Sequence, residues 1–559
     1  MIAMKIYKGI PGAPGVASGK VLYFEKNAAE IKSVDFDDAV QNAIEKVSRL
    51  EQKALADLGE DKAKIFAAYK MLLEDEVLLG QIRAEIEGGS APADAVSSVT
   101  EMMAGVLAAK ENEYLRQRAD DIRYIGEILK SELAGGSDFA FPGGSEKYIL
   151  AAHELTPVDT MTFDHSRLAG LVCEVGGATS HTVILAKSIG IPAIVGAGGI
   201  MADRAEGVAY LDGYTGEFAT SPDDAANRKY TKLLQDEEQL KRQLDEIRTI
   251  DAHTADGERI SVLVNIGKPS DLSKLGDEKI DGVGLFRSEF LYSSASKKPT
   301  KEEQIEAYKK VIDAVYPNPV TVRTIDVGGD KQISYLNMKQ EENPFLGSRG
   351  IRLCLDNPDI FAEQLEALLI AGAGKSIKIM LPMITRLDEI RKTREILSQI
   401  REKLDAENTK YCVRVSLGIM IETPAAAITA DVFAKHCDFF SIGTNDLVQY
   451  LTAADRGNAD VEEVYNPYHP AVLIMLSRVI KAGAAAGIDV SVCGDLAANT
   501  DFTEVLLGMG LTKFSVPLPV AGRIKHKIGT ISKKAAEALA EKALAAEDEN
   551  EVMKILRKE

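Results

Sequence analysis

The chain has 559 residues, which is enough for about two to four domains with large buried cores. Its 66 Lys and Arg residues are outnumbered by 85 Asp and Glu residues, so the formal net charge is −19. That balance argues against nucleic-acid or anionic-membrane binding, which needs a basic face, but it permits a basic protein partner. The five cysteines are scattered, no apolar run could span a bilayer, and the first residues do not resemble a signal peptide, so we expect a cytoplasmic protein.

The first quarter of the chain contains a short strand-like segment followed by a long helical one. The segment from Lys5 to Phe24 is rich in Gly and β-forming residues, which predicts short strands and turns. From about Ala29 to Leu133, Pro and Gly nearly vanish and apolar residues recur at helical spacing, which predicts several long amphipathic helices. Residues 30–132 contain 22 acidic and 13 basic side chains, so this helical block carries about half of the net charge.

Strand-like and helix-like segments alternate from about Lys147 to Ala219, which predicts a compact α/β domain. We expect the opening strands to complete its sheet, so that the helical block is an insertion. A highly charged segment from Ser221 to Ala252 predicts a long linker helix. The predicted domains are an α/β domain at residues 1–28 and 145–220, a helical subdomain at 29–144, a linker at 221–254 and a barrel at 255–559.

The C-terminal half shows a regular order of strand, loop and helix. Eight apolar, β-rich runs follow one another: ISVLVNI, DGVGLF, VTVRTIDV, SIKIMLPM, VSLGIMIE, DFFSIG, DVSVCG and KFSV. Eight such units over about 300 residues predict a (β/α)8 TIM barrel. The overall prediction is a multidomain α/β protein, with a helical stretch from Ser532 to Glu559 at its end.

A histidine stands in an unusual turn, Gly176-Gly177-Ala178-Thr179-Ser180-His181, followed by the helix-forming TVILAK. Thr179 and Ser180 are good N-cap residues, so His181 is expected at a helix N-terminus, where backbone N–H groups stabilise an anion. A neutral imidazole there is a competent nucleophile for a phosphoryl group. The alternative is a structural histidine in a turn.

The segment GGATSHTVILAKSIGIPAIVG resembles the phosphohistidine segment of the PEP-utilising enzymes. The resemblance implies a swivelling domain whose His181 is phosphorylated transiently by phosphoenolpyruvate (PEP), with Thr160 helping to orient it. Lys187 stands where relatives often carry Arg, which keeps the charge but loses bidentate phosphate bonding.

A second group of residues lies near the predicted carboxyl ends of the barrel strands, where barrel active sites form. PEP carries a phosphate and a carboxylate, which planar arginines bind, and Mg²⁺ prefers carboxylate oxygens. We expect Glu422 and Asp446 to bind Mg²⁺ and Cys493 to protonate the enolate of pyruvate. The expected substrate-binding residues are Arg287, Arg323, Asn445, Arg456 and, from the resemblance, Arg349. The substrate end should therefore be locally cationic.

Seven segments resemble, in order, those of the PEP-binding barrel of the Enzyme I family of bacterial phosphotransferase systems: GLFRSEFLY, RTIDVGGDK, EENPFLGSRGIR, GIMIETPAA, FFSIGTNDLVQY, DRGN and CGDLA. CGDLA has Asp495 where relatives usually have Glu. The resemblance implies phosphoryl transfer from PEP through His181 to the histidine carrier protein HPr, with release of pyruvate. It also implies that HPr docks on the acidic helices and that the barrel forms a homodimer.

Two alternatives remain open from the sequence. An enzyme that interconverts pyruvate and PEP would need an ATP-grasp domain ahead of the histidine turn, but only 175 residues precede Gly176 and they contain no Walker-type loop. An inactive regulatory homologue would not need the intact His181, Cys493, Glu422 and Asp446.

Overall fold

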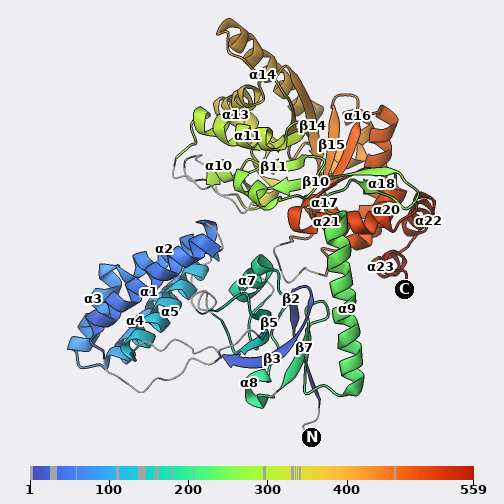
Figure 1. The fold of residues 1–559 in the computed structure, drawn as a ribbon. Helices are drawn as coiled ribbons and strands as arrows, with labels where there is room; N and C mark the ends of the chain where they lie inside the picture. The colour runs from blue at the N-terminus through green and yellow to red at the C-terminus, as the bar shows by residue number, and fades with distance from the viewer. Residues whose placement is uncertain are drawn as a thin grey trace. The chain divides into compact units, whose positions relative to one another are not determined.

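The structure is a computed structural model of the whole chain. It describes all residues except 1–3, 25–33, 58–59, 109–112, 136–145, 156–158, 160–162, 178–179, 206, 294–296, 329–332, 334, 336–337, 339–340, 457, 459–460 and 462. Contacts divide the chain into two compact units, Met1–Leu240 and Lys241–Glu559 (Figure 1). This division does not test the four predicted boundaries, which stay a prediction.

The acidic segment of the first unit is helical. Its helices are α1 (Phe36–Asp57), α2 (Glu60–Leu73), α3 (Glu76–Glu87), α4 (Pro92–Ala108) and α5 (Glu113–Leu133). Ala39, Ala43 and Val47 follow one another at intervals of four along α1 and are fully or almost fully buried, because this spacing keeps them on one helix face. The Asp75 carboxylate begins α3 by accepting hydrogen bonds from the backbone N–H groups of Val77 and Leu78 at 2.9 and 2.8 Å.

An eight-stranded sheet forms the rest of this unit, in the order β1-β8-β7-β3-β4-β5-β6-β2. The strands are β1 (Lys5–Lys8), β2 (Ile10–Ala13), β3 (Val16–Phe24), β4 (Tyr148–Ala152), β5 (Leu168–Cys173), β6 (Ala193–Val195), β7 (Val208–Asp212) and β8 (Glu217–Thr220). β3 pairs in parallel with β4, so the chain leaves the sheet into the helical block and returns beside the strand it left. The predicted fold of an α/β domain with a helical insertion is thus confirmed.

Strand β4 is buried on both faces of the sheet, and its side chains alternate between two apolar clusters. Tyr148 and Leu150 of β4 belong to one cluster, whereas Ile149 and Ala151 belong to the other. Two helices accompany the sheet, α7 (His181–Ile189) and α8 (Ile200–Asp203).

The linker helix α9 (Asp224–Ile247) is shorter than the predicted segment of residues 221–252. It begins where the Asp223 carboxylate accepts a hydrogen bond from the backbone N–H of Ala226 at 2.8 Å. At 1.5 Å per residue, its 24 residues extend roughly 36 Å. The boundary between the two units falls within this helix.

The second unit is a closed barrel of parallel strands, as predicted from the eight apolar runs. The strands are β10 (Arg259–Ile266), β11 (Val283–Arg287), β12 (Val320–Arg323), β13 (Ser376–Leu381), β14 (Arg414–Ile421), β15 (Phe439–Gly443), β16 (Asp489–Cys493) and β17 (Lys513–Pro517). Each strand pairs with the next, and β10 closes the barrel by pairing with both β11 and β17. A short strand, β9 (Ala252–His253), pairs antiparallel with β10.

Helices connect and surround these strands (Figure 1). They are η1 (Pro269–Lys274), α10 (Phe290–Ser293), α11 (Lys301–Val315), η3 (Pro344–Leu346), α12 (Ile351–Asp356), α13 (Pro358–Ala371), α14 (Leu387–Ala406), α15 (Pro424–Ile428), α16 (Ala430–Phe433), α17 (Thr444–Thr452), α18 (Pro470–Ala486), α19 (Asp495–Ala498), α20 (Thr500–Gly508), α21 (Leu518–Gly529), α22 (Lys533–Leu544) and α23 (Glu549–Arg557). The last two fall within the stretch that was predicted to be helical.

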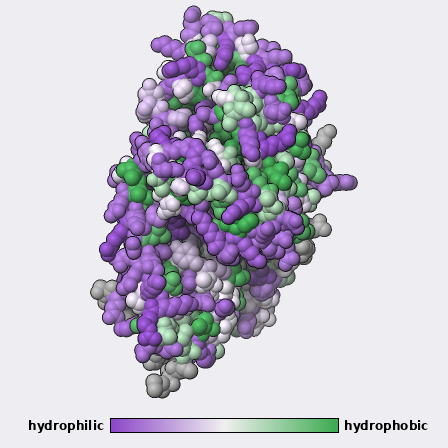
Figure 2. All heavy atoms as spheres, turned by 90° about the vertical axis from the view of Figure 1, so that its right-hand side faces the viewer, coloured by the Kyte–Doolittle hydropathy of each residue, from purple (hydrophilic) through white to green (hydrophobic). Residues whose placement is uncertain are grey.

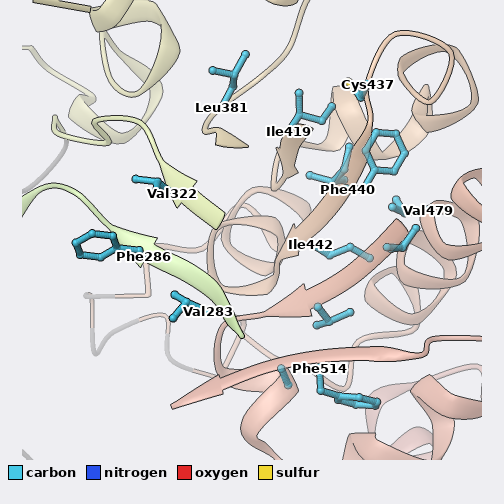
Figure 3. Packing of buried hydrophobic residues seen from close by; sticks show 14 of the residues in the cluster. Val283, Phe286, Val322, Leu381, Ile419, Cys437, Phe440, Ile442, Val479 and Phe514 are labelled. Atoms are coloured by element: carbon cyan, nitrogen blue, oxygen red, sulfur yellow. The ribbon is translucent and has the colours of Figure 1, made fainter. Parts of the chain in front are cut away.

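Alternation along the barrel strands separates two apolar clusters. Phe286, Phe440 and other buried side chains form the large cluster seen in Figure 3. Their strand neighbours Leu285 and Phe439 belong to a small cluster that also contains Cys493. Because successive side chains of a strand point to opposite faces, this small cluster marks the barrel interior.

The surface is that of a polar protein. On the face shown in Figure 2, hydrophilic residues predominate and hydrophobic ones occur in patches. In the part of the chain that the structure describes, no helix is both long and apolar enough to cross a membrane.

The barrel core predicts a large effect of one truncation. Phe440 is 0% exposed, so Phe440→Ala should lower the free energy of unfolding by about 3–5 kcal/mol through lost burial and a cavity. Urea unfolding followed by circular dichroism should show a lower midpoint. The control Val413→Ala, at a side chain that is 75% exposed, should change stability by less than about 0.5 kcal/mol. An unchanged midpoint for Phe440→Ala would contradict this packing.

Candidate functional site

Strands β11, β12, β14, β15 and β16 end around one cavity of about 240 Å³. This is the end at which barrel enzymes place their active sites. The barrel residues predicted from the sequence all line it: Arg287, Arg323, Arg349, Glu422, Asn445, Asp446, Arg456 and Cys493. The structure therefore brings together residues that are up to about 200 positions apart in the sequence, while their individual roles stay predictions.

Two arginines in the cavity are held by buried carboxylates. The Arg323 guanidinium donates from Nη2 to Glu289 Oε1 at 3.0 Å, and its Nη1 lies 2.9 Å from Asp326 Oδ2. Arg349 donates from Nη2 to both oxygens of Asp326, at 3.2 and 3.1 Å, and from Nη1 to Asp446 Oδ1 at 3.0 Å. The two guanidinium groups thus share the Asp326 carboxylate.

These ion pairs keep both arginines charged. Burial alone would lower the pKa of Arg323 and of Arg349, but the surrounding carboxylates outweigh it and raise both above their ordinary value. One donor is left over, because the buried Arg323 Nε has no hydrogen-bond partner among the described residues. A buried donor without a partner is costly, and an anionic ligand in the cavity would be a suitable acceptor.

Glu422 and Asp446 form the candidate cation site. Glu422 is 1% exposed, and its Oε1 accepts a hydrogen bond from the backbone N–H of Met383 at 2.6 Å. Burial and the negative charge of Asp446 raise the pKa of Glu422 to about 8. A Cβ atom on Gly443 would come within 2.9 Å of Glu422 Oε2, so the glycine leaves that oxygen room.

This donor set fits Mg²⁺. Two carboxylates that repel each other beside a cavity are relieved by a hard cation, which binds carboxylate oxygens and retains water or substrate oxygens as its other ligands. No cluster of three or more His, Cys, Asp or Glu side chains suited to a metal occurs among the described residues.

Cys493 ends β16 and is buried in the barrel interior. Its Sγ accepts a hydrogen bond from Ser441 Oγ and donates one to the carbonyl oxygen of Ile442, both at 3.4 Å. Burial raises the pKa of the Cys493 thiol, so the sulfur keeps its proton. A protonated thiol beside the cavity is the form that a proton donor requires.

The rim of the cavity is polar and more open. Asn445 donates from Nδ2 to Asp495 Oδ2 at 3.0 Å and accepts from the Asp495 backbone N–H at 2.9 Å. The shorter carboxylate of Asp495 therefore still reaches Asn445. Arg287 is exposed at the end of β11, and Arg456 Nη1 lies 3.9 Å from Asp446 Oδ2.

The histidine turn lies in the first unit, between β5 and α7. Helix α7 begins at His181, as predicted, after an extended Ser180 and after Gly176 with φ of +114°. Ser180 stands at the N-cap, as predicted, although its buried Oγ makes no hydrogen bond within the described part of the chain. Lys187 is exposed in the last turn of α7, whereas the His181 side chain and the whole of Thr160 lie outside the described residues.

The sequence prediction missed two acids, Glu289 and Asp326. Both stand within three residues of the end of a barrel strand, so their position was a usable signal. Asp326 lines the cavity in addition to the predicted Glu422 and Asp446, so the site is less cationic than expected from its four arginines.

Comparisons with known proteins define the class. Three family models match the chain: the PEP-binding domain of PEP-utilising enzymes at residues 241–532, their N-terminal domain at 8–118 and their mobile domain at 144–216. Together with the barrel and its cavity, these matches define a PEP-utilising enzyme.

Sequence identity to individual proteins shows which family of PEP-utilising enzymes the chain belongs to. The phosphoenolpyruvate-protein phosphotransferases of Listeria monocytogenes and Staphylococcus aureus are 38% and 37% identical to the chain, each over 99% of both proteins. A solution structure of an Enzyme I protein is 30% identical and covers 42% of this chain and 99% of its own, with a TM-score of 0.36. The chain belongs to the phosphoenolpyruvate-protein phosphotransferase family, the Enzyme I proteins, and catalyses PEP-dependent phosphotransfer in the phosphotransferase system.

The raised pKa of Glu422 predicts a pH-dependent stability in protein kept free of divalent cations. The unfolded chain loses this proton at lower pH than the folded protein, so folding stability should fall from about pH 5 to about pH 8. Glu422→Gln has no carboxyl group to titrate at this position, so this fall in stability should be missing from the variant. The difference in unfolding free energy, variant minus wild type, should therefore increase by a few kcal/mol from about pH 5 to about pH 8, since a tenfold difference in proton affinity corresponds to about 1.4 kcal/mol.

The measurement is urea unfolding of both proteins in a chelating buffer at the two pH values. The control Glu306→Gln changes an exposed glutamate of α11 and should show no such pH dependence. An identical difference between Glu422→Gln and wild type at both pH values would contradict the raised pKa.

Proposed function

We propose that the chain transfers the phosphoryl group of PEP to His181 and then to the histidine carrier protein HPr, releasing pyruvate. The observation that carries the proposal is the convergence of Arg323, Glu422, Asp446 and Cys493 on one cavity at the carboxyl ends of the barrel strands. These side chains match the two anionic groups of PEP, a divalent cation and the enolate that remains after transfer.

Arginines bind and orient PEP in this proposal. Arg287, Arg323 and Arg456 present guanidinium groups to the cavity, with Asn445 beside them. Arg323 Nε, the buried donor without a protein partner, is a suitable contact for a phosphate or carboxylate oxygen. The Arg349 donors already contact Asp326, Asp446 and Tyr450, so we assign Arg349 a supporting position.

Glu422 and Asp446 would hold Mg²⁺, which neutralises charge on the phosphate when bound. The imidazole of His181 then attacks phosphorus in line. An N–P bond forms, and the bond between phosphorus and the enol oxygen breaks with its electron pair left on the enolate. The Cys493 thiol protonates the enolate on carbon, which gives pyruvate and a thiolate that regains its proton from solvent.

The second transfer, to HPr, requires a docking surface. At the corner between α2 and α3, Met71 and Val77 are 73% and 62% exposed, and the acidic Glu74 and Glu76, which stand between them in the sequence, are exposed too. Exposed apolar side chains next to exposed acids suit a basic, phosphate-accepting protein. Because one histidine must serve PEP and HPr in turn, we also propose that the histidine domain swivels.

Three further features of the proposal rest on the family alone. We propose that the protein acts in the cytoplasm, that it forms a homodimer through the barrel, and that Thr160 orients His181 while Lys187 supports it.

Radiolabelled PEP tests the first transfer. Wild type should acquire acid-labile label with Mg²⁺, and His181→Ala should lose it, because the phosphoryl acceptor is gone. His153→Ala is the matched control, since His153 is another histidine of the same unit, exposed and paired with Glu174. Undiminished label on His181→Ala, or formation of PEP from ATP and pyruvate, would contradict the proposal.

The docking surface predicts a separate defect. Combining Met71→Ala with Glu74→Lys should raise the HPr concentration for half-maximal transfer about tenfold, which corresponds to about 1.4 kcal/mol of lost binding. Labelling by PEP alone should stay unchanged. The control pair Val413→Ala with Glu306→Lys likewise truncates one apolar side chain and reverses one acidic charge at exposed sites of the barrel unit. Equal effects of the two pairs on HPr transfer would contradict the assignment of this surface.

A further inference from the structure

One carboxylate, that of Asp326, contacts both buried arginines of the cavity. Asp326 Oδ2 lies 2.9 Å from Arg323 Nη1, while Nη2 of Arg349 donates to both of its oxygens and Nε donates to Oδ1 at 3.3 Å. The side chains of the three residues are 4%, 10% and 7% exposed, so water contributes little to these contacts. We propose that Asp326 is a positioning residue for phosphoryl transfer, which fixes Arg323 and Arg349 relative to each other and to Asp446.

A second acid holds Asp326 itself in place. Glu289 Oε1 accepts a hydrogen bond from the backbone N–H of Asp326 and another from Arg323 Nη2, both at 3.0 Å. Glu289 follows β11 and Asp326 follows β12, so the pair joins two neighbouring strand ends. Side chain and backbone of Asp326 are therefore both fixed from within the barrel.

Two glycines allow Arg349 to lie in contact with Asp326. Gly328 has a φ of +115°, and a Cβ atom there would come within 2.5 Å of Arg349 Cβ. Gly350 has a φ of +57°, and a Cβ atom there would lie 3.3 Å from Asp326 Oδ1. Both positions favour glycine because of their backbone conformation, and together they let Arg349 and the loop after β12 pack in contact.

The physical role of the shared carboxylate follows from charge and entropy. Two guanidinium groups side by side repel each other in a buried site, and each long side chain loses rotamer freedom when it is ordered. Asp326 offsets the repulsion and orders both groups before substrate arrives. Through Arg349 Nη1, which donates to Asp446 at 3.0 Å, the same contact extends to the candidate cation site.

Ordering the two guanidinium groups before substrate binds should matter more for the reaction rate than for the stability of the fold. A misplacement of about 1 Å in a reacting group can reduce the rate about 100-fold. Asp326→Asn keeps the shape of the side chain but removes the charge and one acceptor. We therefore expect the single-turnover rate of phosphoryl transfer from PEP to His181 to fall about 100-fold.

The inference rests on the proposed role of the cavity in binding PEP, and a double-mutant cycle tests it in the full chain. In an Arg349→Met background, Asp326→Asn should cost less than about tenfold, because one of the two groups it positions is already gone. The matched control is Asp281→Asn, which removes a carboxylate paired with Arg259 elsewhere in the barrel and should leave the rate unchanged. Equal losses from Asp326→Asn in both backgrounds, or no loss, would overturn the positioning role.

A second variant keeps the test decisive if circular dichroism shows that Asp326→Asn does not fold. Glu289→Gln retains Asp326 but removes the negative charge of Glu289, which contacts Arg323 and the Asp326 backbone. It should slow phosphoryl transfer about tenfold, and the effect should be smaller in the Arg349→Met background. An additive or absent effect of Glu289→Gln would overturn the inference in that case. Failure of the proposed function is distinct, because wild type itself would then acquire no label on His181.

Discussion

Buried arginines need buried carboxylates, and this requirement shapes the carboxyl end of the barrel. Arg323 and Arg349 are less than a tenth exposed, yet their guanidinium groups stay charged because Glu289, Asp326 and Asp446 surround them. The strands of the parallel barrel deliver these residues to one place, since all of their carboxyl ends lie on the same side. The other features of the site adjoin this network. Gly328 and Gly350 leave room for it, and Asp446 of the candidate cation site belongs to it.

The network also explains how an acidic protein can act on an anionic substrate. The chain carries a net charge of −19, and residues 30–132 account for about half of it. At the cavity, carboxylates hold Arg323 and Arg349 in fixed positions, and the Nε donor of Arg323 stays uncovered by the described residues. Attraction of PEP then depends on the placement of a few N–H groups more than on the net charge of the surface.

Much of the architecture could be predicted from the sequence for simple physical reasons. Fully buried parallel strands are continuous apolar runs, so the eight barrel strands are visible as eight such runs. Apolar residues at helical spacing, with Pro and Gly scarcer than in the rest of the chain, likewise marked the inserted block. The linker helix was predicted too long at its C-terminal end, because residues 248–252 contain no stop signal as strong as Gly or Pro.

The candidate site was predictable in position but not in its internal contacts. Arg323 and Asp446 stand at strand ends, and this alone placed them near the cavity. Arg323 is only three residues from Asp326, but the pairing of Asp326 with Arg349 joins residues 23 positions apart, and sequence spacing does not encode such a contact. The position of Ser180 at the N-cap was predictable, but whether its hydroxyl makes the capping hydrogen bond was not, since cap geometry depends on the local backbone.

The central claim is that the barrel cavity and His181 carry out one reversible phosphoryl transfer. Isotope exchange between labelled pyruvate and PEP, without HPr, tests it most directly, because exchange requires both the cavity and a phosphorylated intermediate. Wild type with Mg²⁺ should exchange the label, while His181→Ala and Arg323→Met should each abolish exchange. Exchange that persists in His181→Ala would contradict the claim.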